Sequence, residues 1–258
     1  MAVAYHVIQR LEDDRVLVRD TAQRRIYADT ILRIGRDAGL FCFGLPDTHS
    51  HAGVECDRST AGRFAQRLAV ALRQNLGLVV PFGPVHIREI RDQAHLSNAF
   101  SYILAQASHH GVDADPWLEA TAVPDLLGLR VIGGYLRPRV RALLPRVRRA
   151  DLLARLSIAE LDAGPTLDDL SDAAAATIAV PALVGRAATI VDARRAAIAY
   201  ARGQGADTAR IGQLLGISAR AVRWLERSRA RPDHVRAVGL QLGLRARLRR
   251  PSPDFEVR

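Results

Sequence analysis

The chain has 258 residues, of which 48% are apolar, and a formal net charge of +10. This composition excludes an intrinsically disordered chain, and the length leaves room for two small domains. No apolar run approaches the roughly 20 residues that span a bilayer, and the N-terminal residues do not resemble a signal peptide. Cys42 and Cys56 lie among apolar residues and are expected to be reduced core thiols. We therefore expect a cytoplasmic protein with no membrane partner.

The positive charge is concentrated in the C-terminal part of the chain. Residues 1–185 contain 21 Arg and 21 acidic residues, whereas residues 186–258 contain 16 Arg and 6 acidic residues. A folded segment with such an excess of arginine is typical of a surface that contacts the phosphate backbone of nucleic acids. The alternative is a tail that only keeps the protein soluble.

Residues 1–110 predict seven elements in the order β-α-β-β-α-β-α. The first four are a strand at 3–10, which residues 16–18 extend or pair with, a helix from Asp20 or Thr21 to about 38, and strands at 40–45 and 49–56. The last three are a helix from Ser59, a strand at 85–90, and a helix at 93–110 that Asp92 opens. The first six elements form a split βαβ pattern, which predicts an α+β fold with a ferredoxin-like antiparallel sheet and two helices on one face. The seventh element would be an extra helix that packs beside the sheet.

Apolar spacing assigns an inner face to the first two helices. The predicted inner residues are Ile26, Ile31, Ile34 and Ala38 in the first helix, and Phe64, Leu68, Leu72 and Leu76 in the second. Residues 112–185 are less regular, with prolines between short helical stretches. They include a run of arginines, which is either a solvated helix face or a connector that contacts phosphates: Arg137, Arg139, Arg141, Arg146, Arg148 and Arg149.

Two histidines separated by one residue are the first candidates for chemistry. Side chains alternate along a strand, so His49 and His51 point to one face about 7 Å apart, where two imidazoles can share a metal. A histidine on an edge strand is also often only a solvated side chain, so the pair is a weak signal by itself.

The helix at 93–110 carries the second set of candidates. Tyr102 and Gln106 belong to a polar stripe at helical spacing, together with Asn98 and either His109 or His110. Tyr102 and Gln106 are therefore expected to project together from one helix face. The alternative for Tyr102 is a half-buried tyrosine at the edge of the helix.

Three short segments resemble one protein family. Residues 44–54, Gly-Leu-Pro-Asp-Thr-His-Ser-His-Ala-Gly-Val, resemble the Met-Pro-Asn-His-x-His segment of REP-associated tyrosine transposases, which belong to the wider single-tyrosine HUH transposase (endonuclease) family. Residues 100–106, followed by 110–112, resemble the family's Tyr-Ile-x-x-Asn/Gln segment with its Gly-hydrophobic step, and residues 5–7 resemble its first strand. The resemblance covers about residues 1–135.

The resemblance implies a role for each matching residue. His49 and His51 would bind a divalent metal, Gln106 would be its third ligand, and Tyr102 would be the nucleophile. Tyr102 would attack a phosphodiester of single-stranded DNA, giving a covalent 5′-phosphotyrosine and a free 3′-hydroxyl. The family implies Mg²⁺ or Mn²⁺, whereas ligand softness alone would equally allow Zn²⁺ or Ni²⁺. This chain has Ser50 where the family prefers a bulky apolar residue, so we expect a strand less well anchored in the core.

The basic tail predicts a helix-turn-helix at residues 208–225, preceded by a helix at about 188–202 that completes a trihelical unit. Gly216 would make the turn with a positive φ, Ile217 would fill the core, and Ser218 would cap the second helix. The inward residues are Ile211, Leu215, Val222 and Leu225. The residues expected to contact DNA are Ser218, Arg220, Arg223 and Arg227, with Ala219 also facing outward. The alternative is a plain helical hairpin with a solvated arginine face.

The sequence thus predicts three parts: an HUH transposase-like catalytic domain at 1–135, a helical basic connector at 136–185, and a helix-turn-helix DNA-binding domain at 186–258. The leading function is a transposase-like nuclease for DNA transposition or recombination, which cleaves and rejoins single-stranded or hairpin DNA. Its tail would bind duplex DNA, and the protein would lie with the bacterial nucleoid. The sequence leaves three questions open: the DNA target, whether the protein forms a homodimer, and whether Tyr102 acts in its own or another subunit.

Two other functions compete with this one. The first is a non-catalytic, sequence-specific DNA-binding protein or regulator derived from such a transposase. The second is an unrelated metal-dependent hydrolase with a regulatory tail. The pairing of Tyr102 with Gln106 argues against the hydrolase, because a hydrolase would activate water and would need no tyrosine.

Overall fold

The computed structural model describes residues 3–106 and 115–249. This part of the chain is mixed α+β, with one four-stranded antiparallel sheet and eleven helices, so the predicted α+β class is confirmed. The sheet has the strand order β2-β3-β1-β4. The strands are β1 (Ala4–Arg10), β2 (Leu40–Gly44), β3 (His49–Val54) and β4 (His86–Ile90).

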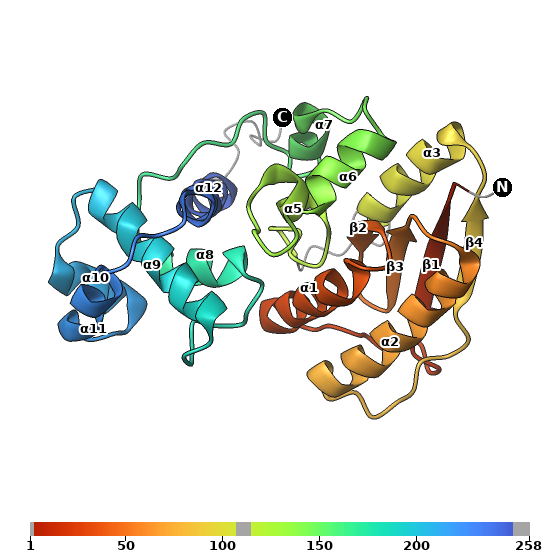
Figure 1. Cartoon of the computed structure of the whole chain (residues 1–258), viewed down its shortest axis with the longest axis horizontal. Coiled ribbons are helices and arrows are strands. Elements are labelled where there is room, and N and C mark those ends of the chain that lie inside the picture. Colours follow the sequence, from red (N-terminus) through yellow and green to blue (C-terminus); the bar gives the residue numbers. More distant parts are fainter. Residues whose placement is uncertain (1–2, 107–114, 250–258) are drawn as a thin grey trace, which may run out of the picture.

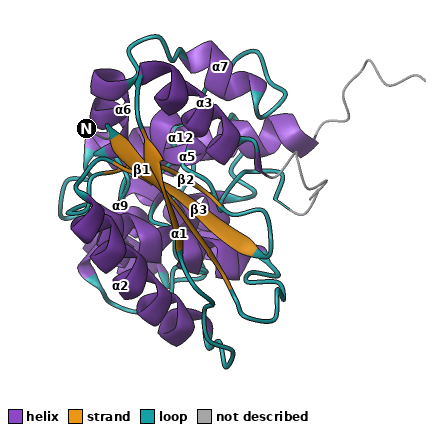
Figure 2. Ribbon diagram, turned by 90° about the vertical axis from the view of Figure 1, so that its right-hand side faces the viewer, coloured by secondary structure: helices purple, strands orange, loops and turns teal. Residues whose placement is uncertain are grey.

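Helices lie on both faces of the sheet. Helices α1 (Thr21–Gly35) and α2 (Arg58–Leu76) cover one face, and α3 (Gln93–Leu104) lies on the other (Figure 2). On the first face, the Gln9 amide of β1 donates a hydrogen bond of 2.8 Å to the carbonyl of Ala65 in α2. Because side chains alternate along a strand, the residues next to Gln9 in β1 face α3 instead.

Strand β3 is anchored through Ser50. The Ser50 hydroxyl lies 2.7 Å from the Tyr27 hydroxyl of α1, within hydrogen-bonding distance, and Ser50 is 2% exposed. A buried hydroxyl is stable when it is hydrogen-bonded, so this pair anchors the strand in place of a bulky apolar residue. The expectation of a poorly anchored strand at Ser50 is therefore wrong.

The boundaries of the first two helices differ in detail from the predicted ones. Asp20 caps α1 as expected, but the helix ends at Gly35, and Ile26 and Ile34 are only half-buried. Its buried face is centred on Tyr27, Ala28, Ile31 and Leu32. Helix α2 begins before Ser59, because its N-cap is Asp57, whose carboxylate accepts from the Thr60 amide. A carboxylate also complements the positive end of the helix dipole.

The segment 16–18 is not a strand, although Leu17 and Val18 are buried. Both cysteines are free thiols as expected, with Cys42 buried and Cys56 half-buried. Among residues 3–106 and 115–249, no helix combines the length and the apolar character that a membrane crossing requires.

The rest of the described chain is helical. The helices are α5 (Val123–Leu127), α6 (Leu136–Leu143), α7 (Arg149–Ala154), α8 (Leu170–Thr177), α9 (Ala188–Gly203), α10 (Thr208–Leu215), α11 (Ala219–Leu225) and α12 (Pro232–Arg249). Helices α5 to α7 lie against the sheet half, whereas α8 to α11 form a separate group, with α12 between the two (Figure 1).

Two buried apolar clusters correspond to these groups. The first contains the sheet with its helices and α5 to α7, and the second contains residues of α8 to α12. Helix α12 contributes to both, because Leu240 and Leu244 belong to the first cluster and Val238 and Leu242 to the second. The C-terminal helix is thus part of the core of both halves.

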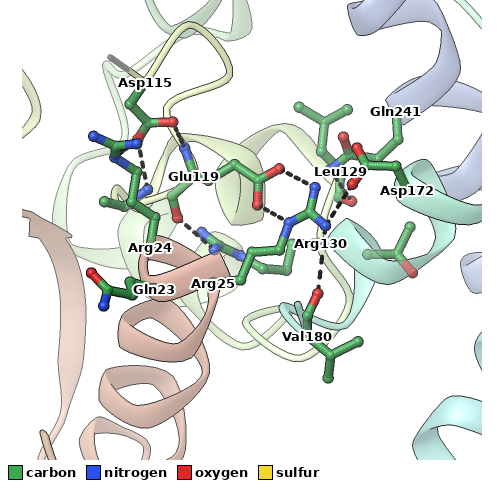
Figure 3. A network of polar contacts seen from close by, with 12 residues as sticks. Gln23, Arg24, Arg25, Asp115, Glu119, Leu129, Arg130, Asp172, Val180 and Gln241 are labelled. Carbon is green, nitrogen blue, oxygen red and sulfur yellow. Dashed lines mark hydrogen bonds and ion pairs between the residues drawn. The ribbon is translucent and has the colours of Figure 1, made fainter. Parts of the chain in front are cut away.

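A buried ionic network also joins the halves (Figure 3). Arg25 of α1 pairs with Glu119, which precedes α5, at 2.6 Å and with Asp172 of α8 at 2.8 Å. Arg245 of α12 reaches the same two carboxylates at 3.4 and 2.7 Å. Both guanidinium groups are about 1% exposed, so each depends on these carboxylates for compensation of its charge.

Candidate active site

Helix α3 approaches the sheet closely at the end of β2. A Cβ atom at Gly44 would overlap the carbonyl oxygen of Ile103, so only glycine permits this contact. In the register of the sheet, Gly44 lies opposite His51 of β3. The absence of a side chain at Gly44 therefore allows the backbone next to Tyr102 to lie over the strand position that carries His51.

The structure brings the two predicted histidines together. The rings of His49 and His51 have their centroids 4.6 Å apart. His51 is 1% exposed, whereas His49 is half-buried at the start of β3, with its Nδ1 atom 3.0 Å from the Thr48 hydroxyl. The pair thus extends from the interior to the edge of the sheet on the face that α3 covers.

A third histidine belongs to the same cluster and was not among the predicted site residues. The Nε2 atom of His6 in β1 lies 2.9 Å from Nδ1 of His51. Burial lowers the pKa of His6 to about 4, helped by the charges of Arg88 and His95, so His6 is neutral at pH 7. This contact uses Nδ1 of His51, so a metal at this histidine would be bound through Nε2. A fixed second ring nitrogen is typical of metal-binding histidines.

Tyr102 stands at the edge of this cluster. Its ring centroid is 5.6 Å from that of His51 and 6.0 Å from that of His6, and its side chain is 47% exposed. Tyr102 is therefore in contact with the buried imidazoles and also accessible from solvent, which a nucleophile for a polymeric substrate requires.

Gln106 lies differently from the prediction. Helix α3 ends at Leu104, and Ala105 has φ −91° and ψ 3°, so the predicted continuous helix is interrupted at Ala105, whereas Gln106 is again helical and residues 107–110 lie outside the described residues. Gln106 is 1% exposed and does not share an exposed face with Tyr102; its amide donates a 3.0 Å hydrogen bond to the Tyr102 carbonyl. Two further members of the predicted stripe, His109 and His110, lie outside the described residues.

The donor set of His49, His51 and Gln106 fits a divalent cation in its chemistry. Gln106 Oε1 is buried and accepts no hydrogen bond from any described residue, which is unfavourable unless another group satisfies it. Within the described ranges, no cluster of three or more His, Cys, Asp or Glu side chains forms a metal centre. Two imidazoles and an amide oxygen are a different donor set, and they leave coordination positions for phosphate oxygens.

A basic groove of about 870 Å³ opens beside Tyr102. Its lining includes His6, Tyr102, Asn98, His95 and Glu89, with three arginines: Arg58 from α2, Arg88 from β4 and Arg91 before α3. The charge count of the sequence gave no sign of this groove, because residues 1–185 are neutral as a whole. The arginines come from three separate segments, so only the fold brings them together.

The second predicted site lies on α10 and α11. Gly216 between them has φ +64°, and the Ser218 hydroxyl accepts a 3.2 Å hydrogen bond from the Ala221 amide, as expected. The predicted inward residues Ile211, Leu215, Val222 and Leu225 are buried. The predicted outward residues Ser218, Ala219, Arg220, Arg223 and Arg227 are exposed.

Gly212 of α10 was not among the residues predicted for this motif. A Cβ atom at Gly212 would lie 2.8 Å from the carbonyl oxygen of Ile217, so this glycine lets the turn pack closely against α10. Its position four residues before Gly216 was visible in the sequence. Trp224, which is 55% exposed beside Arg223, adds a large aromatic surface to the arginine face of α11.

No protein-family model matches this sequence, and neither a curated protein nor a solved structure matches the chain. The function is therefore inferred from two regions of the molecule. These are the cluster of His6, His49, His51 and Tyr102 with its groove, and the arginine face of α11.

Proposed function

We propose that this chain is a transposase-like DNA nuclease of the single-tyrosine HUH type, which cleaves and rejoins single-stranded DNA through a 5′-phosphotyrosine intermediate with a divalent metal. The observation that carries the proposal is the position of Tyr102. Its half-exposed phenol lies 5.6 Å, ring to ring, from the buried imidazole of His51 and lines a groove with three arginines.

In the proposed reaction, the groove arginines Arg58, Arg88 and Arg91 hold the phosphates on either side of the target bond. The Tyr102 hydroxyl loses its proton as its oxygen attacks phosphorus, and the bond between phosphorus and the 3′ oxygen breaks as the 3′ oxygen takes up a proton. The 5′ side stays on Tyr102 as a phosphodiester, and the other strand leaves with a 3′-hydroxyl. Attack of a 3′-hydroxyl on the phosphotyrosine reverses these steps, so the bond energy is conserved.

His49, His51 and Gln106 are the proposed ligands of Mg²⁺ or Mn²⁺, which would neutralise charge on the phosphate oxygens. His6 would orient His51 through the 2.9 Å contact between their rings. Gln106 would present Oε1, because its amide nitrogen is already bound to the Tyr102 carbonyl. Each proposed ligand thus has a second contact before any ion binds, and that of His49 is the Thr48 hydroxyl.

Support for a ferredoxin-like split βαβ arrangement comes from the sheet. Its order is β2-β3-β1-β4, each neighbouring pair is antiparallel, and α1 and α2 lie on the same face. In the proposed division, this sheet belongs to a catalytic domain at 1–135, followed by a connector at 136–185 and a DNA-binding domain at 186–258.

For the tail, we propose that α10 and α11 form a helix-turn-helix that binds duplex DNA. Arg220, Arg223 and Arg227 are exposed and would reach phosphates and guanine edges, and Ser218 at the start of α11 would contact the backbone. A DNA partner of this kind implies a place with the nucleoid in a bacterial cytoplasm.

The second candidate is a non-catalytic DNA-binding protein or regulator. This candidate is favoured because the exposed arginines of α11 include no residue of the Tyr102 cluster, so binding of DNA by α11 would not require that cluster. One experiment separates the two candidates: labelled single-stranded and hairpin oligonucleotides are incubated with the protein and Mg²⁺ or Mn²⁺. A covalent adduct that peptide mapping assigns to Tyr102 supports the nuclease, and duplex binding without any adduct supports the regulator.

A further inference from the structure

A second groove lies between the two halves of the molecule, and residues of α6, α7, α9 and α12 line it. It has a volume of about 810 Å³ and is open to solvent. Four exposed arginines line it: Arg137 of α6 and Arg149 of α7 on one wall, and Arg229 and Arg236, before and within α12, on the other. We call the groove that these four residues line the connector groove. Asp162 is the one acidic side chain among its described lining residues.

The arginines of the connector groove lack carboxylate partners. In the described part of the chain, none of the four forms an ion pair, whereas the buried Arg25 and Arg245 each contact two carboxylates. Partial desolvation lowers the pKa of Arg137, although its side chain is largely exposed, and the charges of Arg141, Arg149 and Arg236 lower it further. These cations therefore repel one another, and an anion in the groove would relieve the repulsion.

Part of the connector groove is fixed in position. The Arg149 guanidinium donates hydrogen bonds to the carbonyls of Leu127 and Leu161, at 3.1 and 3.4 Å. Tyr200, in the wall formed by α9, donates a 2.7 Å hydrogen bond to the Gly164 carbonyl. The two carbonyls that bind Arg149 are neutral, so its positive charge remains. Among the described residues, Arg149 is the groove arginine whose guanidinium is held by hydrogen bonds, and the four cations together suit a ligand with several negative charges.

We propose that the connector groove binds the phosphate backbone of the same duplex DNA that α11 contacts. This inference rests on the duplex-binding part of the proposed function. Three observations favour a duplex: the groove is open, it carries arginines on both walls, and Arg229 follows the exposed Arg227 by two residues. The arginine face of α11 and the groove are thus joined by one short segment, and phosphates recur along a duplex about every 1.7 Å of its axis.

A duplex in this position would touch both halves of the molecule. Arg137 and Arg149 belong to helices that pack with the sheet, whereas Arg229 and Arg236 belong to the segment that follows α11. Bound DNA would therefore have a defined orientation relative to the groove at Tyr102. The connector arginines would then position the DNA without reading its sequence.

The test is the salt dependence of duplex binding by the Arg137→Gln/Arg236→Gln double variant of the full chain. The probe is a random-sequence duplex of about 30 base pairs, roughly three helical turns. The matched control, Arg67→Gln/Arg73→Gln, removes the same charge from exposed arginines of α2. The single variant Arg229→Gln tests the other end of the groove. Thermal melting of each variant verifies that it is folded.

Because the double variant can no longer pair with two phosphates, the slope of log K against log salt should fall by about 2 in magnitude, and affinity at about 0.15 M salt should fall by about 30-fold. Arg229→Gln should lower the slope by about 1. The control should keep the wild-type slope. Binding of single-stranded oligonucleotides at Tyr102, and any adduct, should be unchanged in all variants.

An unchanged slope in both the double variant and Arg229→Gln would overturn the proposal. Inorganic pyrophosphate distinguishes a small phosphorylated ligand: if the double variant no longer binds pyrophosphate but keeps the duplex slope, the groove is not a DNA site. The measurement is an equilibrium binding constant, so it does not depend on cleavage. If no covalent adduct forms, the proposed nuclease activity is contradicted, but the salt slope of duplex binding still tests the connector groove.

Discussion

The phenol ring of Tyr102 meets the imidazole ring of His51 edge to face, with centroids 5.6 Å apart and an angle of 83° between the planes. Tyr102 is 47% exposed and His51 is 1% exposed, so the contact crosses the boundary between solvent and core. A polymeric substrate could therefore reach the phenol, while a metal bound by the imidazoles, as we propose, would be shielded from bulk water.

Tyr102→Phe should abolish the covalent adduct and leave the fold intact. The variant removes one oxygen from a half-exposed side chain, and phenylalanine has no group that can attack phosphorus. The melting temperature and the affinity for single-stranded oligonucleotides should stay at wild-type values. Tyr5→Phe is the matched control, because Tyr5 lies on the face of β1 opposite to His6, and this variant should keep full adduct formation. Adduct formation by Tyr102→Phe would refute the assignment of the nucleophile.

The three histidines should affect the metal in different ways. His49→Ala and His51→Asn remove proposed ligands and should abolish metal-dependent cleavage. His6→Phe keeps both ligands but removes the contact that orients His51, so the Mn²⁺ concentration for half-maximal cleavage should rise by about 10- to 100-fold.

Mn²⁺ binding, measured by calorimetry without DNA, provides a readout that is independent of cleavage. His86→Ala, at an exposed position of β4, is the control for histidine replacement and should bind Mn²⁺ as the wild type does. Unchanged metal affinity in both His49→Ala and His51→Asn would mean that the ion is held elsewhere.

The features that the sequence predicted well are local. Strands and helices follow from periodicity over a few residues, and the caps at Asp20 and Asp92 follow from side-chain bonds to amides three residues on. The turn at Gly216 and the cap at Ser218 were also predictable, because each depends only on residues close to it in the sequence.

The features that the sequence did not predict depend on contacts between segments that are far apart in the chain. His6 and His51 are 45 residues apart, and they meet through the register of β1 and β3. Alternation along β1 was a usable signal, because Tyr5 and Val7 are core residues and His6 must face the other side. The end of α3 before Gln106 had no such signal, since Ala105 is a good helix former.

Gly44→Ala should displace α3 from the sheet and with it the position of Tyr102. The new methyl group would overlap the Ile103 carbonyl oxygen, and overpacking of this kind costs about 1–3 kcal/mol of unfolding free energy. Adduct formation should fall while duplex binding by α11 is retained. Gly62→Ala in α2 is the control, because its added Cβ has no atom within 4 Å, and it should stabilise the protein slightly. Full activity of Gly44→Ala would show that the close approach does not position Tyr102.

Replacing the arginine face of α11 is a better test of the tail than deleting residues 186–258. Deletion would remove α12, whose Leu240 and Leu244 fill the core of the sheet half. Arg220→Gln/Arg223→Gln should lower the salt slope of duplex binding by about 2, because both arginines are exposed and each would release one counterion. Arg67→Gln/Arg73→Gln again provides the control. A wild-type slope in the double variant would exclude α11 as the electrostatic contact with DNA.

The buried network around Glu119 joins the two halves of the molecule. Glu119→Gln should lower the free energy of unfolding by about 3–5 kcal/mol, because it removes a carboxylate from two buried guanidinium groups, Arg25 and Arg245. Both arginines keep Asp172, which is partly exposed and cannot compensate two buried charges alone. The control is Glu226→Gln, which breaks the solvent-exposed pair with Arg202 and should change the free energy of unfolding much less.

Urea unfolding followed by circular dichroism gives both free energies. If Glu119→Gln is no less stable than Glu226→Gln, the buried network does not stabilise the contact between the halves. A destabilisation confined to the helical half, detected as a second unfolding transition, would instead show that Glu119 couples two units that can unfold separately. A single transition at lower urea is the expected result, because α12 contributes side chains to both apolar clusters and the two halves should therefore unfold together.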